Sequence, residues 1–299
     1  MEALILKPGD SLVSRNIEDY PEGIIIPIDK PYRWTSADVI RKVKFAAIRH
    51  FGKKNLKVGH AGTLDPLATG VLLVCIGKAT KLAEELQSHD KEYVAGVTFG
   101  ATTPSYDLEK EIDRFFPYKH ICEEGVRAAL PPFIGVQDQI APLFSAKSVD
   151  GVRAYELARK LYMAMGQSNS DIDEAAKELI RVSKITISEL ELMEYHAYSD
   201  AAGIENGAET SSTETSAGET TSASSRINVT DNSALGLPRA VIRIACSKGT
   251  YVRAFARDLG EALSTGAHLD ALQRSRSGIF RVENALSIDE AIQILNQHL

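Results

Sequence analysis

One aspartate stands in a stiffened loop where it could do chemistry. The stretch GHAGTLDPLATG, residues 59–70, places Asp65 among three glycines and Pro66, and the apolar run VLLVCIG follows at once. Pro66 disfavours the helical region for Asp65, and the glycines permit a tight path and the close approach of a ligand. An ionised carboxylate in such a loop can serve as a base, a metal ligand or a nucleophile. The alternative is an aspartate that caps a turn.

The neighbouring sequence narrows these choices. His60 lies close, but no cluster of His, Asp and Glu has the spacing of a metal site, so no metal is expected. A second acid in a comparable setting, which a two-carboxylate hydrolase needs, does not stand out. GKATK at residues 77–81 lacks the first glycine of GxxxxGK[ST], which argues against a phosphate-binding loop. The functional roles that remain for Asp65 are base and nucleophile.

A strand and a helix precede this loop in the sequence. The segment GIIIPIDKP, residues 23–31, predicts a short buried strand that Pro31 ends. Thr35 and Asp38 match a capping box, so a helix is expected over TSADVIRKVKFAAIRHF. The apolar face of this helix consists of Ile40, Val43, Ala47 and Phe51.

The remaining elements predict the fold class. A strand is expected at residues 71–77, then a helix over KATKLAEELQ and a strand over KEYVAGVTFG (residues 91–100). Two helices follow, one at residues 123–130 that Pro131 and Pro132 stop, and one over VRAYELARKL from Val152. The last elements are strands over KITISELELMEY from Lys184 and RAVIRIACS from Arg239. Strands and helices mix without regular βαβ alternation. This pattern favours an α+β domain with a mainly antiparallel sheet.

Composition indicates an ordinary intracellular globular protein. The chain has 299 residues, of which 44% are hydrophobic and 25% charged, enough to bury a sizeable core. The start MEALILKPGDSL lacks the basic and apolar regions of a secretory signal, and no apolar run is long enough to span a membrane. Three scattered cysteines suggest neither a disulfide framework nor a CxxC site. A reducing cytoplasm fits best.

Charge is distributed unevenly along the chain. The net charge is −6, but the segment between His196 and Leu237 has six acids and one base, so the rest of the chain is close to neutral. Residues 39–64 contain no acid at all. The bases of this stretch are Arg41, Lys42, Lys44, Arg49, Lys53, Lys54 and Lys57. Such a basic stripe suits a phosphate backbone, although a solvated helix face has the same composition.

The acidic segment itself predicts an insertion rather than a domain. Residues 198–236 include the stretch AAGIENGAETSSTETSAGETTSASS, which is rich in Ser, Thr, Glu and Gly, contains almost no large apolar residue and so cannot offset the entropy of ordering. They lie between the two last-named strands, where a hairpin loop tolerates extra length. A disordered loop that is dispensable for activity is expected.

Five stretches in order resemble one enzyme family. They are DKPYRWTS (29–36), GHAGTLDPLATGVLLVCIGKATK from Gly59, DKEYVAGVTFGATTPSYD (90–107), PLFSAKSVDGVRAYELAR (142–159), and CSKGTYVRAFARDLG followed by HLDALQRSRSG. Together they resemble the motifs of the tRNA pseudouridine synthase B family, over about residues 23–280 apart from the insertion. The resemblance implies the pseudouridine synthase fold, with a mixed, mainly antiparallel sheet flanked by helices and a thumb-like insertion that grips RNA.

The resemblance also implies a reaction and roles for four residues. The N1–C1′ bond of a uridine breaks, the base turns, and C5 bonds to C1′, a rearrangement that needs no cofactor. Asp65 matches the carboxylate that attacks the nucleoside or acts at the sugar, and the sequence does not decide between these. Arg253 matches the arginine that keeps that carboxylate charged and oriented through a bidentate pair. Tyr93 matches the aromatic ring that stacks on the flipped base, and Leu272 the apolar wall.

Other residues of the motifs match positions that bind RNA. His60 matches the family position that helps to extract the target nucleotide from the T arm. Lys30, Lys147 and Arg153 are candidate phosphate contacts, with plain surface charge as the alternative. Taken without the resemblance, Tyr93 and Leu272 would be core residues and Arg253 a surface ion-pair partner.

Two positions depart from the family pattern. Arg33 stands where the family usually has Gly, so a different backbone is possible there, and Pro104 replaces a common Asp near Tyr93. About 20 residues follow the last motif, too few for a separate C-terminal RNA-binding domain. One catalytic domain over residues 1–299 is therefore expected, interrupted by the loop at 198–236. RNA binding should then depend on the basic helix and the thumb, and hence strongly on salt.

The sequence predicts a cytoplasmic, monomeric, cofactor-free isomerase. Its substrate is expected to be the uridine at position 55 in the T-loop of tRNA, flipped out of the stack because C1′ and C5 of a stacked nucleotide are not both accessible. One rival is a non-catalytic module that binds or folds tRNA. The other keeps the chemistry but acts on a different RNA stem-loop.

Overall fold

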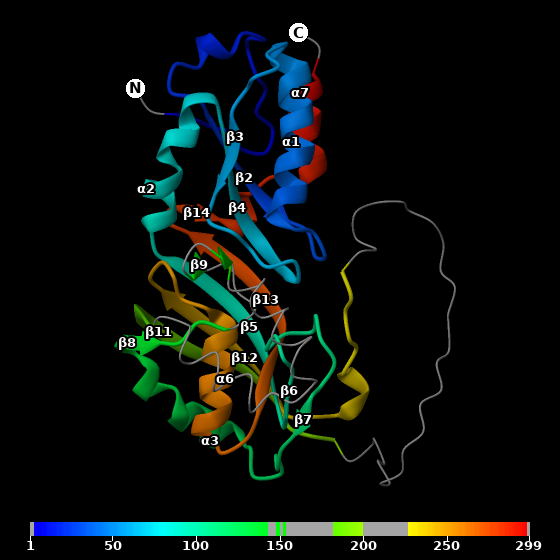
Figure 1. Ribbon diagram of the computed structural model, residues 1–299, viewed down its shortest axis with the longest axis vertical. Helices are drawn as coiled ribbons and strands as arrows, with labels where there is room; N and C mark the ends of the chain where they lie inside the picture. Colours follow the sequence, from blue (N-terminus) through cyan, green and yellow to red (C-terminus); the bar gives the residue numbers. More distant parts are fainter. Residues whose placement is uncertain (1–2, 143–147, 150–151, 154–181, 200–226, 298–299) are drawn as a thin grey trace, which may run out of the picture.

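One long, twisted sheet runs along the length of the molecule (Figure 1). The structure is a computed structural model and describes residues 3–142, 148–149, 152–153, 182–199 and 227–297. The ten strands that these residues contribute to the sheet are β1 (Leu4–Ile5), β2 (Ile24–Lys30), β3 (Val58–Ala61), β4 (Ala68–Ile76), β5 (Lys91–Phe99), β8 (Gly135–Gln139), β11 (Ser183–His196), β12 (Arg239–Cys246), β13 (Ala267–Ser277) and β14 (Phe280–Arg281).

The order of the strands places late chain segments at the centre of the sheet. The path runs β1-β2-β4-β13-β5-β12-β11-β8, while β3 pairs with β4 and β14 with β13. The pairs β1–β2 and β4–β13 are parallel, and the other pairs are antiparallel. This confirms the predicted α+β class with a mainly antiparallel sheet. None of the helices in the described part of the chain combines the length and apolar character that a bilayer crossing requires.

Helices cover the sheet in two lobes. The α-helices are α1 (Ser36–Phe51), α2 (Ala83–Ser88), α3 (Glu123–Ala129), α6 (Val252–Ala262) and α7 (Ile288–Asn296). Short 3-10 helices are η1 (Ile17–Asp19), η2 (Gly77–Leu82), η3 (Pro131–Phe133), η5 (Ser233–Leu235) and η6 (Val282–Asn284). Short strands outside the main sheet are β6 (Ala101–Thr102), β7 (Arg114–Phe115), β9 (Ser148–Val149) and β10 (Val152–Arg153). Figure 1 shows α1, α2 and α7 in the upper lobe, and α3 and α6 in the lower one.

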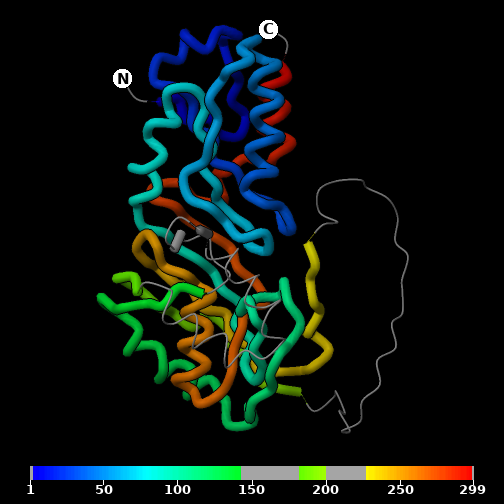
Figure 2. The backbone as a smooth tube through the Cα atoms, in the orientation of Figure 1, coloured from blue at the N-terminus to red at the C-terminus, as the bar shows by residue number. Residues whose placement is uncertain are grey.

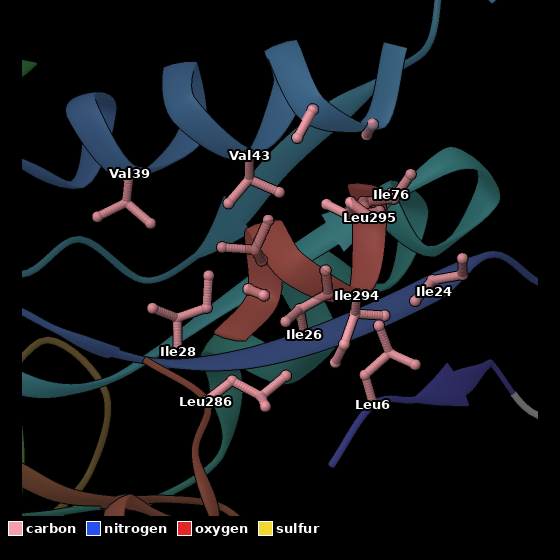
Figure 3. Packing of buried hydrophobic residues seen from close by; sticks show 14 of the residues in the cluster. Leu6, Ile24, Ile26, Ile28, Val39, Val43, Ile76, Leu286, Ile294 and Leu295 are labelled. Carbon is pink, nitrogen blue, oxygen red and sulfur yellow. The ribbon is translucent and has the colours of Figure 1, made fainter. Parts of the chain in front are cut away.

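Each lobe has its own apolar core. In the upper lobe, α1 and α7 pack their apolar faces onto β2 and β4, with Val39, Val43 and Ile26 fully buried (Figure 3). In the lower lobe, α6 packs onto β5, β12 and β13 around Phe255 and Ile242. Because the sheet passes continuously from one core to the other, its middle strands can carry residues into the space between the lobes.

The sequence signals of α1 form as predicted. The Thr35 side chain accepts a hydrogen bond from Asp38 N, and the Asp38 side chain accepts one from Thr35 N. The predicted apolar face is buried at Val43, Ala47 and Phe51. This reciprocal cap fixes where α1 begins, directly after the turn that faces the Asp65 loop.

Most other predicted elements are confirmed, with two corrections. The strands at 23–31, 71–77 and 91–100, the helix at 123–130 and the two later strands all form. The helix over KATKLAEELQ is wrong in its first half, because Gly77–Leu82 form the 3-10 helix η2 and only Ala83–Ser88 are α-helical. The helix from Val152 is wrong at its start, where Val152–Arg153 form β10, and its remainder lies outside the described residues.

The long insertion connects neighbouring strands. β11 and β12 pair antiparallel from Ile187↔Cys246 to His196↔Arg239, so the segment between them is an extended hairpin connection. Residues 200–226 lie outside the described residues, and the disorder predicted there stays a prediction. Residues 227–236 are described and run beside the 101–115 hairpin (Figure 2). The predicted insertion is therefore too long at its C-terminal end.

Candidate active site

A cavity of about 360 Å³ opens where the two lobes meet. Its walls come from the loop before β4, from β5, from the start of α6 and from β13. Asp65, Tyr93, Arg253 and Leu272 all line it, although they are far apart in the sequence. The fold thus brings together the four residues to which the resemblance assigned roles in the reaction.

The Asp65 loop is held by its neighbours on both sides. Ser36, at the start of α1, exchanges hydrogen bonds with the backbone of Leu64, at 2.9 Å from Leu64 N and 3.1 Å to Leu64 O. The buried Arg274 donates from Nε to Val71 O at 2.7 Å and from Nη2 to Gly62 O at 3.2 Å. The Asp65 side chain remains 39% exposed at the mouth of the cavity. A rigid backbone with an accessible carboxylate is what a catalytic base or nucleophile requires.

Gly70 permits the close approach of β4 to β13. Its φ is +96°, and a Cβ there would lie 2.3 Å from Arg274 O. Any side chain would therefore push apart the two strands that carry Ala68 and Leu272 side by side. The glycine after the Asp65 loop thus preserves the shape of the cavity floor.

A buried arginine pairs with Asp65. Arg253 Nε donates to Asp65 Oδ2 at 2.9 Å, and its Nη1 donates to Ser105 O at 3.1 Å. Burial disfavours the charge of Arg253, but Asp65 and Asp107 outweigh burial and raise the pKa of the guanidinium. The predicted pairing of Arg253 with Asp65 is present, and it is a buried contact rather than a surface ion pair.

Two further acids, which the sequence analysis did not single out, lie beside Arg253. Asp107 Oδ2 is 3.6 Å from Arg253 Nε, and burial raises the pKa of Asp107 despite that positive charge. Glu109 follows, and burial together with Asp107 raises the pKa of Glu109 to about 7. Asp107 is the last residue of the motif DKEYVAGVTFGATTPSYD (90–107), and its place in that motif was the available signal. Its buried contact with an arginine far along the chain was not visible in the sequence.

Tyr93 and Leu272 form the apolar side of the cavity. Both are half-buried, and both pack against the upper and the lower core. Burial raises the pKa of Tyr93, which keeps its hydroxyl protonated. Lys91 lies on the same strand with its Nζ donating to Gln87 O and His89 O, and burial lowers its pKa to about 8. An apolar wall beside fixed polar groups suits a flat, partly polar ligand such as a nucleobase.

Lys30 corrects one prediction. Its side chain is fully buried, and Nζ donates to Pro31 O at 3.0 Å, Trp34 O at 2.6 Å and Pro66 O at 3.1 Å. Burial lowers the pKa of Lys30 to about 8. Lys30 is neither a phosphate contact nor a surface charge, because its three donors are used inside the protein. It holds the carbonyl of the residue after Asp65.

Arg33 keeps a backbone conformation that favours glycine. Its φ is +63°, in the left-handed region, so the Arg at this position does not change the path of the turn. Arg33 N donates to Pro66 O at 3.0 Å, beside the bond from Lys30. The turn at residues 30–34 therefore supports the Asp65 loop from the side of α1.

The other predicted RNA contacts lie outside the cavity or outside the described residues. His60 is half-buried in β3, opposite Val74, and is not among the described residues that line the cavity. Burial and the charge of Arg274 lower the pKa of His60, so its ring is neutral at pH 7. Lys147 lies outside the described residues, and of Arg153 only the backbone is described, in β10. Among the described residues, no three His, Cys, Asp or Glu side chains are grouped to hold a metal ion.

Known proteins resemble this chain in sequence and in fold. Residues 49–210 match the model of the TruB family pseudouridylate synthase (N terminal domain). The chain is 44% identical over 279 residues to tRNA pseudouridine synthase B of Phocaeicola vulgatus, covering 93% of this chain and 96% of that protein. It is 38% identical over 265 residues to the protein of that name from Thermus thermophilus, covering 88% of this chain and 75% of that one.

Solved structures show the same fold at low sequence identity. A Cbf5-Nop10-Gar1 complex contains a chain that matches with a TM-score of 0.55 and 22% identity, covering 96% of this chain and 60% of that one. The archaeal box H/ACA sRNP Nop10-Cbf5 complex contains another, with a TM-score of 0.51 and 20% identity, covering 91% of this chain and 53% of that one. The chain thus spans little more than half the length of these structural neighbours.

Proposed function

The chain belongs to the TruB family of pseudouridylate synthases, and we propose that it converts the uridine at position 55 in the T-loop of tRNA to pseudouridine. One observation carries the proposal. The Asp65 carboxylate is exposed to a cavity, held by the buried Arg253 and faced by Tyr93 and Leu272. The relatives that are named tRNA pseudouridine synthase B support tRNA as the substrate.

The chemistry follows from the positions of the four residues. Asp65 is the group that attacks the nucleoside or acts at C1′ while the N1–C1′ bond breaks and the C5–C1′ bond forms. Arg253 fixes the direction of the Asp65 carboxylate through a charge-assisted hydrogen bond. Leu272 limits the access of water to the detached base, and Tyr93 offers its ring for stacking. C5 loses a proton and N1 gains one as the C5–C1′ bond replaces the N1–C1′ bond, so the product has the composition of the substrate and the rearrangement is an isomerisation.

The uridine must leave its stack to reach Asp65. The cavity volume of about 360 Å³ lies within the range of small-ligand sites, roughly 300–1,000 Å³. His60 lies in β3, two residues before Gly62, which lines the cavity. We propose that His60 helps to extract the nucleotide from the T arm. RNA is proposed to be gripped by the basic face of α1 and by the thumb region at residues 142–159, which carries Lys147 and Arg153.

We further propose that the enzyme acts as a monomer in the cytoplasm. Asp65, Tyr93, Arg253 and Leu272 line one cavity within a single chain, as a monomeric enzyme requires. The three cysteines are free, with Cys122 exposed, which suits a reducing compartment.

The test is an assay of pseudouridine formation. Purified protein is incubated with unmodified tRNA transcript, and pseudouridine is mapped along the RNA while tRNA binding is measured separately. We expect wild type to modify the T-loop uridine, and Asp65→Asn to bind tRNA within about twofold of wild type but form no product. Asp90→Asn, which removes an exposed carboxylate outside the cavity, is the matched control and should keep full activity.

Two other outcomes decide between the rivals. Binding without modification by wild type contradicts the proposal and favours a module that binds or folds tRNA. Modification of a different stem-loop, with the T-loop untouched, retains the chemistry and replaces the substrate. An isolated T-arm hairpin and unrelated hairpins of equal length, run side by side, separate these cases.

A further inference from the structure

Two non-glycine residues with left-handed backbone lie beside the two aspartates of the site. The described residues include three such positions, Arg33 (φ +63°), Tyr106 (φ +56°) and Ser264 (φ +55°). Arg33 supports the residue after Asp65, and Tyr106 immediately precedes Asp107. Backbone conformations of this kind persist where surrounding contacts hold them, and they gather at functional sites.

The C-terminal end of the insertion connects these two places. Residues 227–230, here called the strap, run past both of them (Figure 2). The Arg33 guanidinium donates from Nη2 to Ile227 O at 2.8 Å. Three residues later, Thr230 N donates to Leu108 O at 2.9 Å. One end of the strap is therefore tied to the turn under Asp65, and the other end to the residue after Asp107.

The two ties lead to the same ion pair. Arg33 N donates to Pro66 O, next to Asp65, whose Oδ2 is 2.9 Å from Arg253 Nε. Leu108 follows Asp107, whose Oδ2 is 3.6 Å from the same nitrogen. The strap thus bridges the two loops that place a carboxylate on each side of Arg253. Any relative movement of the loops changes the direction of Asp65.

Two hydrogen bonds tie the strap to the loops of the site, so single substitutions can test it. A cleft of about 700 Å³ lies between much of the strap and the 104–113 loop, and half of the residues that line it are charged, among them Glu109, Glu111 and Asp113. The side chains of Ile227 and Val229 are half-buried, and the two hydrogen bonds supply the directional contacts of the strap.

We propose that Arg33 is a positioning residue that acts through the strap. By tying residues 227–230 to the Asp65 loop, it fixes the separation of the Asp65 and Asp107 loops around Arg253. It thereby sets the rate of the isomerisation step rather than the affinity for tRNA. This inference rests on the proposed function. It assigns a role in catalysis to the last residues of a segment that composition alone presents as a dispensable loop.

The first test separates rate from binding. Arg33→Gly removes the guanidinium while keeping the left-handed turn free of strain, and Thr230→Pro removes the N–H of the second tie. We expect each variant to lower the single-turnover rate at saturating tRNA by roughly tenfold to a hundredfold, the loss that small misplacements of a catalytic group produce. The dissociation constant for tRNA should change by less than about twofold.

Two comparisons complete this test. Arg33→Lys retains a donor that can reach Ile227 O and should restore part of the rate. Arg15→Ala removes another arginine whose Nε donates to a backbone carbonyl, His50 O at 3.2 Å, far from the cavity, and it should leave the rate unchanged.

A double-substitution cycle tests whether Arg33 acts through the strap. Residues 200–230 are replaced by a Gly/Ser linker of the same length, and Arg33→Gly is added to this variant. We expect the linker variant to be as slow as Arg33→Gly, and the combined variant to be no slower. The inference would be overturned if adding Arg33→Gly to the linker variant lowered the rate by the same factor as it does in wild type. It would also be overturned if Arg33→Gly alone and the linker variant alone both kept the wild-type rate. Weakened tRNA binding at an unchanged rate would show that Arg33 contacts RNA directly.

A readout without activity keeps the inference separate from the proposed function. If wild type modifies no RNA, the proposed function fails, while hydrogen exchange still reports on the strap. Arg33→Gly should then increase exchange in both residues 62–68 and residues 103–109, and Arg15→Ala in neither. Unchanged exchange in the two loops would overturn the positioning role.

Discussion

At the scale of single residues, several acids of the site share one buried guanidinium. The buried Arg253 faces Asp65 and Asp107, and its pKa is raised in part by Glu109. A single guanidinium cannot stabilise three ionised carboxylates equally in a partly buried space. Burial, together with the charge of Asp107, raises the pKa of Glu109 to about 7.

This raised pKa predicts a pH-dependent stability. Glu109 has a pKa of 4.5 when unperturbed and about 7 in the folded protein, so the folded state binds its proton more tightly. The stability that this proton contributes is complete below pH 4.5 and is lost as the pH rises through 7. Glu109→Gln cannot ionise. We therefore expect its melting temperature to match wild type at pH 4.5 and to exceed it by roughly 2–6 °C at pH 8.

Thermal melts of both proteins across this range are the measurement. Glu111→Gln, an exposed acid on the same loop, is the control and should show no pH-dependent difference from wild type. A Glu109→Gln variant that is less stable than wild type at pH 8 would show that the ionised carboxylate makes a favourable contact, contrary to this prediction.

The sequence identified site residues that belong to recognisable motifs, but it did not reveal roles that depend on contacts made only in the folded chain. The motifs around Asp65, Tyr93, Arg253 and Leu272 identified residues that do share one cavity. Lys30 was misjudged because a lysine in a sequence carries no sign of burial, and its carbonyl partners at Trp34 and Pro66 meet it only after folding. Asp107 was missed for the same reason, since its partner Arg253 comes from a distant helix.

At the scale of elements, the contact between β4 and β13 determines the cavity floor. Gly70→Ala places a Cβ 2.3 Å from the backbone oxygen of Arg274 and also strains a φ of +96°. We expect it to lower the free energy of unfolding by about 3 kcal/mol or more and to abolish most activity. Chemical denaturation and the tRNA assay measure the two effects.

Gly9→Ala is the matched control for this substitution. Gly9 also has a positive φ, +86°, but a Cβ there meets no atom within 4 Å. The expected loss is therefore only the conformational strain, about 1–2 kcal/mol, with activity retained. Equal losses in the two variants would show that strain, not the close approach of β4 and β13, controls stability at Gly70.

The sequence predicted helices and strands, which depend on neighbouring residues, better than it predicted contacts between distant residues. The capping box of α1 is a property of neighbouring residues and formed as predicted, and the strand expected at residues 91–100 formed as β5. Residues 227–230 fell within the predicted disordered loop because they adjoin a long polar stretch, although Ile227 and Val229 are themselves apolar. Their order comes from Arg33 and Leu108, which lie more than a hundred residues earlier, and no local pattern encodes such ties.

At the scale of the whole molecule, positive charge is concentrated on the face of α1 that we propose binds RNA. The basic residues of the α1 region are exposed, namely Arg41, Lys42, Lys44, Arg49, Lys53, Lys54 and Lys57. We expect the logarithm of tRNA affinity to fall steeply with the logarithm of salt concentration. Lys42→Ala combined with Lys44→Ala should reduce the slope by about 1.4 to 1.8, since each phosphate contact contributes roughly 0.7–0.9.

Binding titrations at several salt concentrations give these slopes. Lys119→Ala combined with Lys184→Ala removes two exposed lysines of the lower lobe and serves as the matched control. An unchanged slope in the α1 variant, or an equal reduction in the control, would contradict the assignment of α1 as a phosphate-binding face.

The insertion divides into a replaceable part and a retained part. Replacing residues 200–226 with a Gly/Ser linker of equal length keeps the strap and removes five acids. We expect turnover within about twofold of wild type, and tighter tRNA binding at low salt because repulsion of the RNA is reduced. Steady-state kinetics at two salt concentrations check both. Loss of turnover in this variant would contradict the prediction and assign the acidic residues an essential role.

The position of β13 also bears on how the enzyme is made. β13 (Ala267–Ser277) lies between β4 and β5, so two strands of the N-terminal half leave a gap that only the last part of the chain can fill. On the ribosome, Asp65 emerges long before Leu272 and Arg274, and the cavity is incomplete until both have left the exit tunnel. A nascent chain therefore exposes unpaired strand edges during most of its synthesis, a state that favours chaperone binding and slow completion of folding. No partly synthesised chain should be able to modify RNA.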